Sequence, residues 1–105
     1  MTKTRPRYQF TEKAERDLEG VIDYTLQQWG ASQADTYLDG LETRAQLLAD
    51  NPDLGTKRET LSEWLLSFSY ESHILYYTKL THGKQCNGIT IVRVLHQNMD
   101  PVKHL

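Results

Sequence analysis

The residues best suited to chemistry lie near the C-terminal end, in the stretch RVLHQNMD at residues 93–100. Arg93 can bind a phosphate or a carboxylate, and the imidazole of His96 titrates near neutrality and can act as an acid or a base. Asn98 and Asp100 add an amide and a carboxylate close by. The stretch therefore fits an active site, a surface that binds a partner, or the polar end of a strand.

Each of these side chains also has a structural interpretation. Arg93 is suited to an ion pair with a carboxylate across a sheet, and His96 to a hydrogen bond that supports the fold. Asp100 is placed to cap the chain before Pro101, and Met99 can fill the core or anchor a partner.

The sequence gives little support to metal or nucleophilic chemistry. The four histidines, at positions 73, 82, 96 and 104, lack the spacing of a zinc site. The chain has no Gly-rich phosphate loop, and its single cysteine, Cys86, cannot form an internal disulfide. We therefore expect neither a metal nor a cofactor.

Length and composition predict one small domain over residues 1–105, with 1–7 as a flexible leader and 101–105 as a tail. No apolar run reaches the roughly 18 residues of a membrane span, and the N-terminal residues lack a secretory signal, so we expect a cytoplasmic protein. The net charge is −2. A protein that binds nucleic acid alone usually has a basic excess, so direct nucleic-acid binding is not expected.

Periodicity predicts two long helices in a hairpin. The first begins at the N-cap Thr11 and ends at Gly30, with apolar residues recurring every three or four positions. The second begins at Ser32 and ends before Asn51-Pro52. Trp29 and Tyr37 are expected to pack between the helices.

The remaining apolar segments read as strands, at residues 8–11, 63–70, 73–80 and 88–95. A polar loop is expected over residues 81–88. Along the last strand, strict alternation would place Ile91 and Arg93 on the same face. The element order β-α-α-β-β-β predicts an α+β fold in which the helical hairpin packs on a small antiparallel sheet.

Three features are specific in combination: Trp29-Gly30, Asn51-Pro52 through Gly55, and the final R-V-L-H-x-x-M-D. With them, the chain resembles the ParE toxins of the ParE/RelE superfamily, the toxic halves of bacterial toxin–antitoxin pairs. Many relatives carry arginine where this chain has Asn98. The matching segments run almost end to end, at residues 8–30, 33–42, 47–61, 73–77 and 89–100.

The resemblance implies a RelE/ParE-like fold and a toxin that inhibits DNA gyrase. It also implies a ParD-type antitoxin that neutralises the toxin in a hetero-oligomer. Two alternatives remain within the superfamily: a RelE-like ribosome-dependent mRNA endonuclease, and a relative that has lost toxicity and only binds an antitoxin.

RNA cleavage requires a base, an acid and cations around the phosphate. His96 has no tyrosine after it, and acids at positions 59 and 63 lie beside the basic pair Lys57-Arg58. Because this set is incomplete, we predict that the chain is not an enzyme and acts by docking on its target through a few anchors.

Two sets of docking residues follow from this prediction. The candidates for target binding are Arg93, His96, Met99, Lys57 and Arg58, together with the tail. The candidates for antitoxin binding, chosen as apolar groups that could be exposed, are Tyr8, Phe10, Trp64 and Leu66.

Overall fold

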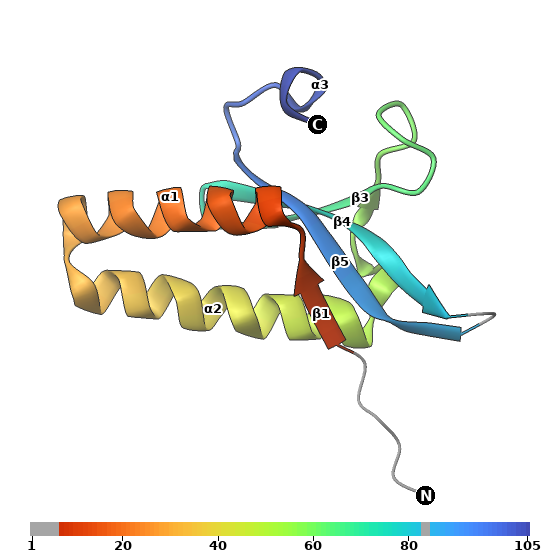
Figure 1. The fold of residues 1–105 in the computed structure, drawn as a ribbon, viewed down its shortest axis with the longest axis horizontal. Coiled ribbons are helices and arrows are strands. Elements are labelled where there is room, and N and C mark those ends of the chain that lie inside the picture. The colour runs from red at the N-terminus through yellow and green to blue at the C-terminus, as the bar shows by residue number, and fades with distance from the viewer. Residues whose placement is uncertain (1–6, 83–84) are drawn as a thin grey trace, which may run out of the picture.

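The computed structural model describes residues 7–82 and 85–105 (Figure 1). The predicted leader therefore lies outside the described residues except for Arg7, which begins the first strand. The elements follow the predicted order, with one short strand, one 3-10 turn and one C-terminal helical turn added. They are β1 (Arg7–Phe10), α1 (Glu12–Trp29), α2 (Ala31–Asp50), η1 (Pro52–Leu54), β2 (Thr56–Lys57), β3 (Leu66–Tyr70), β4 (His73–His82), β5 (Gln85–His96) and α3 (Pro101–His104).

The helical hairpin forms as its capping residues predict. The hydroxyl of Thr11 accepts a hydrogen bond from the Ala14 N–H at 3.2 Å and caps α1. Gly30 has φ +88°, a conformation that side chains disfavour, and α2 begins at the next residue. The helix therefore begins one residue before the predicted Ser32, because the Gly30 carbonyl already accepts the first α2 hydrogen bond, from Ala34.

The prediction that Trp29 packs between the helices is wrong, whereas Tyr37 is buried as expected. Trp29 is 73% exposed. Figure 1 shows the reason: the closed end of the hairpin extends past the sheet, so the last turn of α1 has no layer to pack against.

The sheet has the strand order β1-β5-β4-β3-β2 and is mixed, which corrects the expected antiparallel sheet. Strands β3, β4 and β5 form the predicted antiparallel meander, but β1 runs parallel to β5, with Tyr8 opposite Ile89. No tight turn joins β1 to its neighbour, so the helical hairpin sets its direction. Figure 1 shows both long helices on one side of this sheet.

Strand boundaries differ from the predicted ones at two places. β3 begins at Leu66 because residues 58–65 form turns, closed by an Arg58 N–H to Leu65 carbonyl hydrogen bond of 2.8 Å. The predicted loop at 81–88 is mostly strand, since β4 extends to His82 and β5 starts at Gln85. Residues 83–84 of that loop lie outside the described residues.

A β-bulge interrupts the alternation of β5. The register passes from Tyr76 opposite Arg93 to Tyr77 opposite Ile91, so Val92 is an extra residue on β5. As a result Ile91 and Val94 both pack in the core beneath the helices. The prediction by strict alternation, which paired Ile91 with Arg93 on one face, is therefore wrong beyond Val92.

The main core lies between the helical hairpin and the sheet, and a smaller cluster covers the opposite face of the sheet. In the main core Tyr77 donates a hydrogen bond to the Pro52 carbonyl at 2.8 Å and accepts one from the Gly55 N–H at 2.9 Å. This contact explains the N-P-x-x-G motif, because a Cβ on Gly55 would lie 2.4 Å from the Tyr77 hydroxyl oxygen. The smaller cluster consists of Leu65, Tyr76 and Leu95, with Leu61, Ile74 and Val92 against it.

The predicted tail contains a helical turn, α3, which sequence periodicity had not indicated. The Asp100 carboxylate accepts a hydrogen bond from the Val102 N–H at 3.0 Å, so its predicted capping role is confirmed. Over the described part of the chain, neither long helix combines the length and apolarity that crossing a bilayer requires.

Candidate functional site

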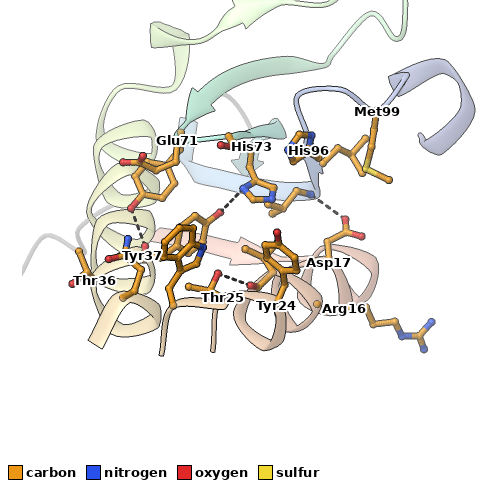
Figure 2. Close-up of a pocket in the computed structure, with 18 residues that line it drawn as sticks. Arg16, Asp17, Tyr24, Thr25, Thr36, Tyr37, Glu71, His73, His96 and Met99 are labelled. Carbon is orange, nitrogen blue, oxygen red and sulfur yellow. Dashed lines mark hydrogen bonds between the residues drawn. The ribbon is translucent and has the colours of Figure 1, made fainter. Parts of the chain in front are cut away.

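An open cleft of about 830 Å³ lies between the helical hairpin and the turn that joins β3 to β4 (Figure 2). One face of α1 forms a wall, the N-terminal half of α2 forms another, and the end of β5 closes the base. The cleft collects residues far apart in sequence, among them Tyr24, Trp29, Tyr37, His73, His96 and Met99.

Two histidines and a tyrosine form the base of the cleft. His73 and His96 are opposite each other on β4 and β5, with ring centroids 5.5 Å apart and planes at 87°. The Tyr37 hydroxyl lies 3.3 Å from Nδ1 of His73. Burial, with a smaller contribution from His96, lowers the pKa of His73 below its ordinary value, so this ring is neutral at neutral pH.

Tyr37, on α2, contacts both β3 and β4, through Tyr70 and His73. Its backbone carbonyl accepts a hydrogen bond of 2.9 Å from the Tyr70 hydroxyl, and the two rings lie 5.1 Å apart. Burial, followed by the charges of Tyr70 and Glu71, raises the pKa of the Tyr37 phenol well above its ordinary value. The phenol is therefore neutral near pH 7 and acts as a hydrogen-bonding group beside His73.

His96 supports the turn that follows β5. Its Nδ1 accepts a hydrogen bond of 3.1 Å from the Asn98 N–H, which requires that Nδ1 carry no proton. Figure 2 shows the His96 ring beside Met99 at one end of the cleft. The hydrogen bond supports the structural interpretation of His96, and the position leaves the ring accessible to a partner.

The mouth of the cleft carries large side chains that are open to solvent. Tyr24 is 62% exposed, Trp29 73% and Met99 39%. Exposed aromatic groups over a hydrogen-bonded base are typical of protein-docking anchors.

Arg93 does not join this site, because its guanidinium is engaged elsewhere. Nε and one terminal nitrogen donate to the two carboxylate oxygens of Asp17, at 2.7 and 3.0 Å, and the other terminal nitrogen donates to the His104 carbonyl. The Val94 N–H also donates to Asp17, at 3.0 Å. Hydrogen bonding to Asp17 raises the pKa of Arg93, so the guanidinium stays charged, and its contacts tie α1, β5 and α3 together.

Lys57 and Arg58 lie apart from the cleft. Lys57 is on β2, three strands away from β5, which corresponds to roughly 14 Å at ordinary strand spacing. The Arg58 guanidinium lies 6.0 Å from the centroid of the Tyr76 ring, on the far side of the sheet. Of the predicted target-binding residues, the structure thus brings together only His96 and Met99.

The predicted antitoxin-binding residues do not form one surface. Tyr8 and Phe10 are half-buried neighbours on β1, with ring centroids 6.0 Å apart, while Trp64 is 73% exposed in the turns before β3, towards the opposite edge of the sheet. Leu66 is only 5% exposed, so the expectation that it is a surface group is wrong. The reason is its place on β3, where it packs in the main core.

Sequence reasoning missed Tyr24, Trp29, Tyr37 and His73 as members of a site. Tyr24 offered a signal, because it is a large aromatic residue outside the apolar stripe of α1. The described side chains include no group of three or more His, Cys, Asp or Glu placed to hold a metal ion.

The architecture matches the fold of a solved structure from a toxin–antitoxin system. A solved structure titled "Chromosomal ParDE TA system from P. aeruginosa" matches with a TM-score of 0.68, covering 87% of this chain and 95% of that one. The sequence identity is 16%, so this likeness concerns the fold alone.

Sequence comparison then fixes the family. A family model described as "ParE toxin of type II toxin-antitoxin system, parDE" matches residues 8–101. Toxin ParE1 of Mycobacterium tuberculosis (strain H37Rv) is 34% identical over 99 residues, 94% of this chain and 97% of the relative. Toxin ParE1 of Caulobacter vibrioides is 30% identical over 98 residues, 93% and 96% of the two chains. The chain belongs to the ParE toxin family of type II toxin–antitoxin systems.

Proposed function

We propose that this ParE-family toxin inhibits DNA gyrase by non-catalytic contact in the cytoplasm and that a ParD-type antitoxin neutralises it. The observation that carries the proposal is the aromatic cleft. Its large exposed side chains can serve as anchors, and two of its charged groups are already paired inside the protein, Asp17 with Arg93 and Arg16 with Glu12. Such a surface offers shape and apolar contact to a partner, with little chemistry to perform.

The distribution of cations supports contact over RNA cleavage. Arg93 is paired with Asp17, and Lys57 lies on β2, three strands away from the strand β5 that carries His96. A phosphodiester placed at His96 would therefore find neither Arg93 nor Lys57 available to stabilise charge in the transition state, and the cleft residue Arg16 is paired with Glu12.

The far face of the sheet supports the same conclusion. Residues 58–65 run over it, and Leu61 and Leu65 pack against the Tyr76 ring. An RNA strand bound over Tyr76 would have to displace this apolar cluster.

Affinity in this proposal comes from a few large anchors. Tyr24, Trp29 and Met99 reach the mouth of the cleft from α1 and from the turn after β5. Residues of this kind often contribute most of the free energy of a protein interface.

Purified gyrase in a supercoiling assay, run beside ribosome-dependent cleavage of an mRNA, tests the proposal. We expect the toxin to inhibit supercoiling, to leave the mRNA intact on translating ribosomes, and to lose its effect when the antitoxin is added. Cleavage of the mRNA that disappears in His96→Ala would replace the proposal with the endonuclease function. A chain that does neither and does not arrest growth when induced would be a non-toxic relative.

A further inference from the structure

One carboxylate in the lining of the aromatic cleft has no ion-pair partner. Glu71, in the turn that joins β3 to β4, is exposed and lines the cleft. The other charged side chains of the lining are already paired, Asp17 with Arg93 and Arg16 with Glu12. Glu71 takes part in none of the ion pairs between described residues. The cleft therefore presents one uncompensated negative charge to a partner.

Glu71 faces the aromatic base of the cleft. Figure 2 shows Glu71 and Tyr37 at the end of the cleft away from Met99. Burial raises the pKa of the Tyr70 phenol, and the negative charge of Glu71 raises it further. The same charge adds to the rise in the pKa of Tyr37, after burial and the contribution of Tyr70. Because such an influence weakens with distance, the carboxylate lies near both rings, whose centroids are 5.1 Å apart.

The backbone of the turn disfavours a glutamate at this position. Glu71 has φ 53°, in the left-handed region that glycine and asparagine prefer, and it is the only non-glycine residue of the described chain with a positive φ. Residues held in such conformations often serve a binding role. The unpaired carboxylate gives Glu71 a group with which to bind.

Aromatic rings beside this carboxylate make the site suited to a cation. Rings attract positive charge through their electron-rich faces, and tryptophan does so most strongly. At Tyr70 the protein already uses this interaction, because the Arg44 guanidinium lies 5.8 Å from the centroid of the ring. Trp29 lines the same cleft and is 73% exposed, so its indole is open to a cation from a partner.

The opposite side of α1 has more acids but no such exposed ring. The groove there, of about 550 Å³, lies along the junction of α1 with α2 and the end of β1. Its floor is aliphatic apart from the half-buried Phe10, and it is also lined by Glu15, Glu19 and Asp23, which have no ion-pair partner among the described residues. A cation in the groove would meet negative charge without an open ring. A cation in the cleft would meet both.

We propose that the end of the cleft formed by Trp29, Tyr37, Tyr70 and Glu71 binds an arginine side chain of gyrase. The guanidinium stacks on the Trp29 indole and pairs with the Glu71 carboxylate. Arginine suits the site better than lysine, because its planar group stacks on a ring while its N–H groups donate to both oxygens of a carboxylate. The inference rests on the proposed function only in naming gyrase as the source of the arginine.

The first test uses a small probe and does not involve gyrase. N-acetylarginine amide is titrated into the toxin beside N-acetylcitrulline amide, which has the same length but carries a neutral urea in place of the guanidinium. The NMR signal of the Trp29 indole N–H reports binding. Trp64 is equally exposed and lies outside the cleft next to the exposed Glu63, so its indole signal is an internal control.

We expect the arginine probe to bind at Trp29 at least about fivefold more tightly than the citrulline probe, and Glu71→Gln to weaken its binding by a similar factor. Glu63→Gln removes the same charge outside the cleft and should bind the probe as wild type does. Equal affinity for the two probes, or an equal response of Trp64, would overturn the inference and leave the proposed function standing.

The second test asks whether gyrase supplies the arginine. Glu71→Lys places a cation at the site, Glu63→Lys makes the same charge change outside the cleft, and thermal unfolding verifies that both variants are folded. In a supercoiling assay Glu71→Lys should need at least about tenfold more protein for half-inhibition, while Glu63→Lys should stay within about twofold of wild type.

Two outcomes of the supercoiling assay would count against gyrase as the source. Equal inhibition by Glu71→Lys and wild type would overturn the assignment of the arginine to gyrase. A wild-type chain that binds the arginine probe but leaves supercoiling unaffected would contradict the proposed function, and the gyrase assignment with it.

Discussion

The two sides of α1 show how one helix can present two different surfaces. On the cleft side, Asp17 is paired with Arg93, His73 is held neutral by burial, and exposed aromatic residues stand at the mouth. On the groove side, the floor is aliphatic and carboxylates such as Glu19 have no ion-pair partner among the described residues. The cleft presents shape and apolar contact, whereas the groove presents negative charge that no described ion pair offsets.

The largest effect is expected from breaking the ion pair on the cleft side. Asp17→Ala leaves the Arg93 guanidinium without its carboxylate where both side chains are only 17% exposed, and should lower the free energy of unfolding by about 3 kcal/mol. Arg16→Ala, which removes the exposed Arg16–Glu12 pair on the same helix, should cost less than about 0.5 kcal/mol. Urea unfolding measures both, and equal costs would mean that the Arg93–Asp17 pair is not structural.

Two glycines distinguish the packed and open parts of the helical hairpin. A Cβ on Gly40 would lie 2.1 Å from the Tyr70 hydroxyl oxygen, so Gly40→Ala must displace the ring that holds Tyr37 and should cost about 2 kcal/mol. Gly20 has nothing within 4 Å, so Gly20→Ala should stabilise α1 by up to about 1 kcal/mol. Thermal unfolding of both variants measures these changes in stability. A stabilising effect of Gly40→Ala would show that the Tyr70 hydroxyl does not pack against Gly40.

Removing one hydroxyl tests the base of the cleft alone. Tyr37→Phe keeps the ring but removes the contact with His73, and should cost about 1 kcal/mol of stability. A variant as stable as wild type would show that the Tyr37–His73 contact contributes nothing.

The smallest effect concerns pH. The pKa of His73 is lowered in the folded chain from 6.5, so the unfolded chain binds this proton more readily. The contribution of His73 to stability is therefore complete above about pH 6.5 and is lost as the pH falls below that value. Between about pH 8 and pH 5, His73→Gln should lose less stability than wild type in urea unfolding, and identical pH profiles would contradict this assignment.

The helical half of the fold was predictable from sequence because its signals are local. The caps at Thr11 and Gly30 and the three- and four-residue spacing each lie within one helix. The bulge at Val92 and the parallel direction of β1 depend on pairing between distant strands, so no local pattern contains them.

The site was only partly predictable for the same reason. His96 and Met99 were identified from the C-terminal motif, but the partner of Arg93 is Asp17, 76 positions away. Trp29 was assigned to the core because its spacing fits the apolar stripe of the first helix. It is exposed because the helical hairpin extends past the sheet, and the relative lengths of hairpin and sheet depend on the whole fold.

The most direct test of the account uses two tryptophans of equal exposure, Trp29 in the cleft and Trp64 outside it, each 73% exposed. Wild type, Trp29→Ser and Trp64→Ser are titrated into a gyrase supercoiling assay. Because the cleft supplies the anchors in the proposed function, Trp29→Ser should need roughly tenfold more protein for half-inhibition, while Trp64→Ser should inhibit as wild type does. Equal potency of Trp29→Ser and wild type, or a wild-type chain without effect on supercoiling, would contradict it.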